Sequence, residues 1–299
     1  MINNIKEIYE NRKINYSSIK SLCDFNIINS NDVDVSVIIP VKGRENFNLP
    51  LINHLLAAMD EFKEKTYSIT FVEHSDVSTH KEICKGKTNH IWIKKTPNEF
   101  FNKCLAMNVG ALFSNKAKYY LFHDIDLLVK KNFFYDLFAN LNKFSEETAL
   151  QTFGGRKVVV MNNNLTNRIL SGSTHIDSVI PGSSESPYSN PGAPGGSIFI
   201  KSNSFYKIGG FDAEFFHSYS HEDAFFYHKA EVIIGIRGCN DPLIDSFHMD
   251  HPRTNGADNP DIGIQKKIYM TFINMNHREK EDLICYIAKN IKEEYEKRV

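Results

Sequence analysis

Two aspartates separated by one residue are the strongest chemical signal in the sequence. Asp124 and Asp126 directly follow an apolar run, residues 119–122. Side chains at positions i and i+2 of an extended segment point the same way, and parallel α/β sheets bind ligands beyond the carboxyl ends of their strands. Two hard oxygen ligands facing one site suit Mg²⁺ or Mn²⁺ that also carries phosphate oxygens. Because so short a pattern is common by chance, a solvated strand end is the alternative interpretation.

Two further groups of ionisable side chains lie downstream. Glu222 and Asp223 open an apolar helical stretch, where adjacent residues point about a quarter-turn apart. One can therefore hold a substrate hydroxyl while the other accepts a proton, and the alternative is a simple interaction with the helix dipole. His248 and His251 can converge on one cation from a turn or a helix, although isolated surface histidines are the commoner explanation of such a pair.

Alternating strand and helix patterns are expected to position these residues. Short apolar runs at residues 35–40, 67–72, 90–93 and 119–122 are typical of strands, and residues 47–64 and 98–113 carry helical periodicity between them. A helix over 132–144 and a strand over 158–161 follow. Such alternation predicts an α/β fold, with a mostly parallel twisted sheet covered by helices on both faces.

The remaining segments suggest how the chain is organised. Residues 1–32 are polar and predict an N-terminal helical appendage, and residues 33–276 form the main domain. Residues 162–194 are rich in Ser, Asn, Gly and Pro, which indicates a lid, a binding loop or disorder. Residues 277–299 predict a C-terminal amphipathic helix that docks on the domain.

The bulk composition excludes several classes of function. Lysine plus arginine (35) nearly balances aspartate plus glutamate (36), so no strong field attracts nucleic acid. Five widely spaced cysteines lack a C-x-x-C pair, which favours a reduced, cytoplasmic chain over a zinc or redox protein. Neither a leader peptide nor a membrane-spanning run is evident. Any membrane association is therefore expected to be peripheral.

The motifs, taken in order, resemble the β-1,4-galactosyltransferases (family 7) and the chondroitin-polymerase-like (family 2) transferase domains. The resemblance spans residues 34–255 and includes a first turn at 39–44 (IPVKGR). The other pieces are 101–110 (FNKCLAMNVG), 122–127 (FHDIDL), 194–197 (PGGS) with 208–211 (IGGF), the Glu222–Asp223 pair, and His248 with His251. It implies a GT-A fold and a UDP-sugar donor. In that family the arginine of the first turn and a Phe-Asn-Arg segment hold uridine. The corresponding residues here are Arg44, Phe101 and Lys103. Lysine keeps the charge but loses the planar fork.

The resemblance also implies a metal site and a catalytic base. The family's metal is held by the last aspartate of the D-x-D pattern and by a C-terminal histidine, with a methionine or histidine three residues earlier. These positions correspond to Asp126, His251 and His248, and they imply Mn²⁺ or Mg²⁺. Asp124 is expected against the ribose or diphosphate of the donor. The family's catalytic aspartate corresponds to Asp223, with Glu222 on sugar hydroxyls.

Other positions bear on which sugars are used. The family's Trp-Gly-Gly acceptor platform is replaced here by a turn with Tyr219, whose ring still offers a face for stacking. Gly195 and Gly196 would let the backbone approach the donor closely, or form an ordinary turn. Galactose-selective members carry tyrosine two residues before these glycines, and smaller side chains admit an N-acetylhexosamine. Ala193 therefore favours an N-acetylated donor.

The sequence thus predicts a metal-dependent, inverting glycosyltransferase that moves a hexose or N-acetylhexosamine from a UDP-sugar to a glycan or glycolipid acceptor, in bacterial surface polysaccharide synthesis. A sugar nucleotidyltransferase would have a longer, glycine-rich phosphate loop after the first strand than residues 41–44 provide. A catalytically silent sugar- or nucleotide-binding module is the other alternative, since fold does not fix function.

Overall fold

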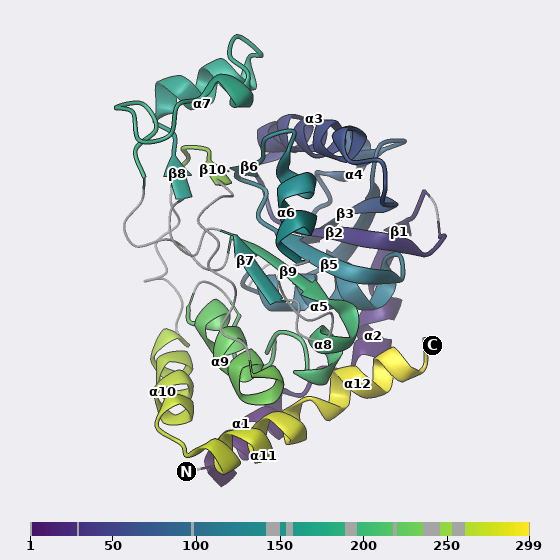
Figure 1. The fold of residues 1–299 in the computed structure, drawn as a ribbon. Coiled ribbons are helices and arrows are strands. Elements are labelled where there is room, and N and C mark those ends of the chain that lie inside the picture. Colours follow the sequence, from purple (N-terminus) through teal and green to yellow (C-terminus); the bar gives the residue numbers. More distant parts are fainter. Residues whose placement is uncertain are drawn as a thin grey trace.

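The fold was analysed in a computed structural model of the chain (Figure 1). The structure describes residues 2–28, 30–96, 99–141, 150–153, 158–188, 196–217, 220–235, 246–252 and 261–298.

A seven-stranded sheet in the order β1-β4-β3-β2-β5-β9-β7 forms the centre of the molecule. The four middle strands, β4, β3, β2 and β5, run parallel, whereas β1, β9 and β7 each pair antiparallel with a neighbour. The strands are β1 (Cys23–Asn26), β2 (Val33–Val41), β3 (Tyr67–Ser75), β4 (Asn89–Lys94), β5 (Ala117–His123), β7 (Leu150–Phe153) and β9 (Ser197–Lys201). The predicted α/β fold with a mostly parallel sheet is therefore confirmed.

Helices cover both faces of this sheet because its central strands are apolar on both sides. Along β2, Val37 and Ile39 belong to one hydrophobic cluster and Ile38 to the other, as strand alternation requires. One cluster contains α3 (Glu45–Glu61), α4 (Lys81–Cys84), α6 (Phe133–Leu141) and α7 (Asn163–Leu170). The opposite cluster contains α1 (Ile2–Arg12), α2 (Tyr16–Ser21), α5 (Lys103–Phe113), α8 (Ser202–Lys207), α9 (Glu222–Ile234), α10 (Ile262–Ile273), α11 (His277–Ile287) and α12 (Lys289–Glu296).

A second sheet of three short strands lies beside the carboxyl end of β5. Its strands are β6 (Leu127–Leu128), β10 (Ser246–His248) and β8 (Val158–Val160), in the order β6-β10-β8. β10 pairs antiparallel with β6 and parallel with β8. Because β6 starts immediately after Asp126, this small sheet connects the D-x-D segment to the segment that carries the two histidines.

The terminal segments share one core. Tyr9 of α1 donates a hydrogen bond to the carbonyl of Ile287 at 3.0 Å, and Figure 1 shows α1 alongside α11. Residues 1–32, for which helical structure was expected, contain α1 and α2. β1, in contrast, was not expected, and it extends the main sheet. The predicted boundaries at residues 33 and 277 stay a prediction.

Several element limits differ from the sequence expectation. The C-terminal segment forms two helices that meet at Ala288 instead of one helix. α5 starts at Lys103 because the side chain of Asn102 accepts a hydrogen bond from the amide of Leu105 at 2.8 Å and so caps the helix. The expected loop over 162–194 contains α7 and a short 3-10 helix, Ile176–Ser178. Its residues 189–194 lie outside the described residues.

Arg298 connects the end of the chain to the end of α5. Its guanidinium donates to the carbonyls of Ala111 and Leu112, each at 2.6 Å, and to that of Ser114. These are carbonyls at the C-terminus of α5, where the helix dipole favours a cation. We expect Arg298→Ala to lower the free energy of unfolding by about 2 kcal/mol, since hydrogen bonds from charged groups contribute about 1.5–3 kcal/mol.

Lys297→Ala is the matched control for this prediction. Lys297 is 63 % exposed and pairs only with Glu294 on its own helix in the described structure, so its loss is expected to cost less than about 0.5 kcal/mol. Denaturant unfolding of both variants measures the difference. Equal losses would show that the contact to α5 contributes nothing specific.

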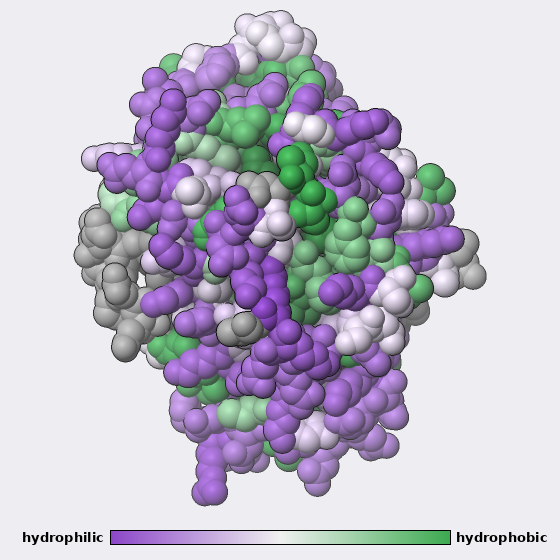
Figure 2. Space-filling view, turned by 90° about the vertical axis from the view of Figure 1, so that its right-hand side faces the viewer, coloured by the Kyte–Doolittle hydropathy of each residue, from purple (hydrophilic) through white to green (hydrophobic). Residues whose placement is uncertain are grey.

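No helix among the described residues is both long and apolar enough to cross a membrane. The face shown in Figure 2 is predominantly hydrophilic, with smaller hydrophobic areas between the polar side chains.

Candidate functional site

Asp126 lies in the turn between β5 and β6 and is held by the segment that follows β10. Its carbonyl accepts a hydrogen bond from the amide of Met249 at 2.8 Å. The next residue, Leu127, pairs with His248 in the small sheet. These backbone contacts fix the D-x-D turn against the histidine segment, although the two are far apart in the sequence.

The two histidines converge on Asp126. His251 Nε2 lies 2.9 Å from Asp126 Oδ2 across 125 residues of sequence, and His248 Nε2 lies 3.8 Å from the same oxygen. The three potential ligand atoms all lie within 4.8 Å of one another. The structure therefore brings together the three residues that the sequence resemblance selected as metal ligands.

The hydrogen bonds of this cluster define the ring nitrogen that faces the carboxylate. His251 Nδ1 lies 2.9 Å from the carbonyl of Pro252, to which it can donate, so Nε2 is directed at Asp126. The hydrogen bond with Asp126 raises the pKa of His251. Burial alone would raise the pKa of Asp126, but the hydrogen bond from His251 and the nearby charges of His248 and Arg44 lower it.

The donor set fits a divalent transition metal. One carboxylate and two imidazoles are offered from neighbouring positions, and one histidine is already oriented by a backbone carbonyl. Mg²⁺ takes oxygen ligands almost exclusively, whereas Mn²⁺ accepts both carboxylate and imidazole. Of the two ions implied by the sequence, the side chains of Asp126, His248 and His251 therefore suit Mn²⁺ better.

Arg44 also contacts Asp126. It lies in the turn after β2, where Gly43 and Arg44 both have left-handed backbone angles, with φ of 64° and 63°. Arg44 is the only non-glycine residue among those described with a positive φ, a conformation that costs roughly 1–2 kcal/mol. The turn directs its guanidinium onto Asp126 Oδ2, with which it forms an ion pair. Sequence resemblance assigned Arg44 to uridine, and here it lies at the metal cluster.

Asp124 has a separate cationic partner. Lys103 Nζ lies 2.9 Å from Asp124 Oδ1 and 3.1 Å from Oδ2. The amide of Asp124 donates to the carbonyl of Gly196 at 2.8 Å. A Cβ atom added at Gly196 would lie 2.6 Å from Leu127 Cδ1, so a side chain here would displace the residue that follows Asp126. The absence of a side chain at Gly196 thus allows Leu127 to pack closely against it.

Glu222 and Asp223 begin α9, and both are close to Lys103. The amide of Ser220 donates to Glu222 Oε2 at 3.0 Å. Asp223 Oδ1 is buried and accepts no hydrogen bond from any described residue. Burial and the charge of Glu222 raise the pKa of Asp223 to about 6, while Lys103 lowers it. Lys103 itself has a raised pKa: burial lowers it, but Asp124, Asp223 and Glu222 outweigh that effect. The two sequence motifs therefore meet at Lys103.

Phe101 precedes α5 in the sequence and lies in space beside His74, near the end of β3. Its ring centroid lies 6.2 Å from that of His74, and the amide of Asn102 donates to His74 Nδ1 at 3.0 Å. Burial lowers the pKa of His74 to about 4, so the imidazole is a neutral acceptor. Phe101 is half-buried, two residues before Lys103.

His123 is a positioning residue that the sequence analysis did not identify. It is buried, its Nδ1 lies 2.8 Å from Ser197 Oγ, and its Nε2 lies 2.8 Å from the carbonyl of Leu127. Burial lowers its pKa to about 4, so a neutral ring bridges β9 and the D-x-D turn. The available signal was its place directly before Asp124, at the end of an apolar strand.

Three predicted positions, Ala193, Gly195 and Tyr219, lie outside the described residues. Among the described residues that follow in the sequence, the ring of His221 stacks on Tyr269 of α10 with centroids 4.7 Å apart.

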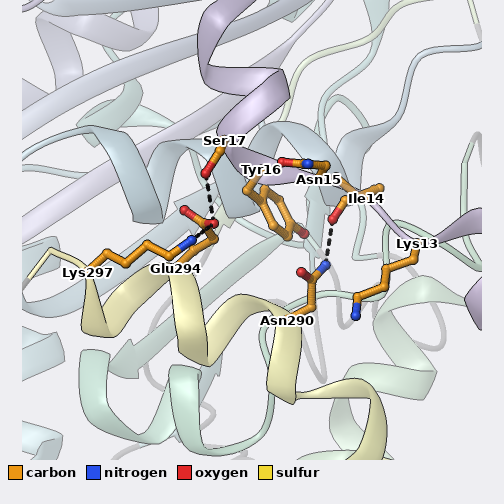
Figure 3. Close-up of a pocket in the computed structure, with 8 residues that line it drawn as sticks. All are labelled: Lys13, Ile14, Asn15, Tyr16, Ser17, Asn290, Glu294 and Lys297. Carbon is orange, nitrogen blue, oxygen red and sulfur yellow. Dashed lines mark hydrogen bonds and ion pairs between the residues drawn. The ribbon is translucent and has the colours of Figure 1, made fainter.

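A pocket of about 340 Å³ lies elsewhere, between the α1–α2 connection and α12 (Figure 3). Its lining includes Ser17 and Lys297, both hydrogen-bonded to Glu294, and Asn290, which donates to the carbonyl of Ile14 at 2.7 Å. None of the residues of the Asp126 site lines it. We assign it no part in the chemistry, because its polar groups largely satisfy one another.

Comparisons with known proteins identify the architecture. No protein-family model matches the chain, and no curated protein matches it. Among solved structures, the mannosyltransferase PcManGT from Pyrobaculum calidifontis, in complex with GDP-Man and Mn²⁺, has a TM-score of 0.52 at 11% identity, covering 97% of this chain and 82% of that chain. GalNAc-T7 with UDP, GalNAc and Mn²⁺ has a TM-score of 0.50 at 15% identity, covering 89% and 55%. The catalytic domain of Drosophila β1,4-galactosyltransferase 7 matches with a TM-score of 0.46 at 14% identity, covering 76% and 78%. At these identities the likeness shows the fold: the chain has the GT-A fold that its sequence motifs led us to expect.

Proposed function

We propose that this protein is a metal-dependent, inverting glycosyltransferase that transfers a hexose or N-acetylhexosamine from a UDP-sugar to a hydroxyl of a glycan or glycolipid acceptor. The observation that carries the proposal is the group formed by Asp126, His248 and His251 at the carboxyl edge of a GT-A sheet. In such sheets ligands bind beyond the carboxyl ends of the strands. The GT-A fold supports the class of reaction, and the sequence resemblance supports uridine as the base.

The residues have separate roles in a single displacement. Asp223 accepts the proton of the acceptor hydroxyl while that oxygen forms a bond to the anomeric carbon. The bond between the anomeric carbon and the diphosphate oxygen breaks at the same time, and UDP leaves with the bonding electrons. Attack from the face opposite the leaving group inverts the anomeric configuration. Glu222 holds sugar hydroxyls, and Phe101 offers its ring to the uracil.

The reaction also requires positive charge near the diphosphate, which gains negative charge as it leaves. Lys103 provides a fixed positive charge beside Asp124. Asp126, His248 and His251 would hold Mn²⁺, which when bound neutralises the charge that develops on the departing diphosphate.

The acceptor and pathway rest on the sequence resemblance. We infer a cytoplasmic enzyme that extends a bacterial surface glycan, and the replacement of a larger residue by Ala193 favours an N-acetylated donor.

UDP release from a panel of donors tests the proposal. UDP-galactose, UDP-glucose and their N-acetylated counterparts would each be incubated with Mn²⁺, with Mg²⁺ and with chelator, with and without candidate glycans. We expect turnover of one donor that depends on Mn²⁺. Donor binding that never leads to hydrolysis or transfer would favour the binding-module alternative, and absence of any nucleotide binding would refute the proposal.

The pH dependence of the reaction follows from the environment of Asp223. A general base works only when ionised, and the pKa of Asp223 is raised to about 6 by burial and by Glu222. We therefore expect kcat/KM to be constant above about pH 7 and to fall tenfold per pH unit below about pH 6. Rates would be measured from pH 5 to 8 at saturating Mn²⁺. Because protonation of the histidines also weakens metal binding, a Mn²⁺ titration at each pH separates the two effects. A flat profile would contradict the assignment of Asp223 as base.

A further inference from the structure

One oxygen of Asp126 serves three cationic or potentially cationic groups. Asp126 Oδ2 pairs with the guanidinium of Arg44, lies 2.9 Å from His251 Nε2, and lies 3.8 Å from His248 Nε2. The Asp126 side chain is only 8 % exposed, whereas that of Arg44 is 34 % exposed. The carboxylate is thus confined, and the guanidinium has access to solvent.

Asp126 Oδ2 faces both histidines and is also the oxygen that Arg44 contacts, so a metal ion held by Asp126, His248 and His251 would share it with Arg44. An arginine side chain is a permanent cation, so Arg44 makes room for a metal ion only by moving. Two cations that share one buried carboxylate oxygen repel each other strongly, because the interior screens charge poorly. The ion pair and the metal are therefore competing states of one site.

The charges at the D-x-D turn show what would favour the metal. Lys103 pairs with Asp124, and Arg44 pairs with Asp126, so each D-x-D carboxylate has its own cation. Around Asp126 itself, a divalent ion added beside Arg44 leaves an excess of positive charge. A diphosphate supplies the missing negative charge and offers the guanidinium a bidentate partner.

We propose that Arg44 acts as an internal counter-cation for Asp126, and that Mn²⁺ binds tightly only when a nucleotide diphosphate draws the guanidinium away. Arg44 is then a positioning residue that makes the binding of metal and donor cooperative. The left-handed backbone of Gly43 and Arg44 supports this role, since such strain persists where the surroundings hold a side chain in a particular place. The inference rests on the metal site of the proposed function.

Mn²⁺ titrations of the 299-residue chain, monitored by calorimetry with and without UDP, test the inference. Without UDP, Arg44→Gln is expected to bind Mn²⁺ about tenfold more tightly than wild type, because the competing cation is gone. In wild type UDP should strengthen Mn²⁺ binding, and in Arg44→Gln that enhancement should shrink by about the same factor, as linkage between two ligands requires. Arg44→Lys, which keeps a cation, should stay close to wild type without UDP.

Arg168→Gln is the matched control. It also removes one positive charge from an ion pair, with Glu185 at 2.6 Å, but on the segment after β8. Its Mn²⁺ affinity should equal that of wild type. Mn²⁺ affinity that is unchanged or weaker in Arg44→Gln, or an equal gain in Arg168→Gln, would overturn the inference and leave the proposed function intact. A wild-type chain that binds no Mn²⁺ even with UDP would remove the metal site and the inference together.

Discussion

Replacement of Asp223 by asparagine is expected to lower turnover by about 10²- to 10⁴-fold, the usual contribution of a general base. Asparagine has the shape of aspartate but cannot accept the hydroxyl proton at neutral pH. Asp223 Oδ1 is buried and has no hydrogen-bond partner among the described residues, so the carboxylate has a free acceptor position. UDP-sugar binding should change little, because Lys103 and Asp124 still form their ion pair.

Glu222→Gln provides the neighbouring comparison. Glu222 receives a hydrogen bond from the amide of Ser220, which a glutamine oxygen can also accept. The loss of charge in Glu222→Gln is expected to affect KM for the acceptor more than kcat. Steady-state kinetics and calorimetric UDP titrations on both variants distinguish the roles. If Asp223→Asn turned over as fast as wild type, the base would have to be sought elsewhere.

Replacement of Asp126 by alanine is expected to weaken Mn²⁺ binding by at least about 10²-fold, since even residues that only orient ligands contribute 10- to 100-fold. Asp126 supplies the only carboxylate oxygen in the ligand group found among the described residues. Donor binding should then no longer respond to Mn²⁺. His251→Ala should act in the same direction.

Loss of Asp126 also leaves Arg44, His248 and His251 without their shared anion, so reduced stability is a competing explanation. Asp126→Asn keeps the volume of the side chain and removes the charge, and it should reproduce the loss of metal affinity. Asp177→Ala is the control for removal of a carboxylate, because Asp177 pairs with His175 in a different part of the chain. Thermal unfolding of each variant without metal measures how much the substitution changes stability. Mn²⁺ titration curves identical to wild type would refute the metal assignment.

Local patterns were sufficient to identify the central strands and most of the residues discussed here. An apolar run followed by Asp124 and Asp126 placed the carboxylates at a strand end, because burial on both faces selects continuous apolar strands. The same reasoning gave β2, β3, β4, β5 and α3 within a few residues. It missed α4, α7, α10, β1, β6 and β7.

The order of the motifs, through the family resemblance, identified candidate functional residues that hydrophobic periodicity could not. It selected Asp126, His248 and His251 as one group, and the structure brings their ligand atoms within 4.8 Å of one another. It also selected Asp223, which lies near Lys103 and Asp124. Whether these residues bind metal and accept a proton stays a prediction until the experiments above are done.

The sequence by itself determined an α/β fold with a mostly parallel sheet and the chemical types available at the strand ends, because both depend on short-range patterns of apolar and polar residues. The GT-A class followed from the family resemblance of the ordered motifs. Only the tertiary structure decided which groups meet. The antiparallel pairing of β10 with β6 places His251 beside Asp126 across 125 residues, and two consecutive left-handed residues direct Arg44 onto the same oxygen. Long-range strand pairing and backbone angles at a turn depend on the packing of the whole domain, which no local spacing of residues encodes.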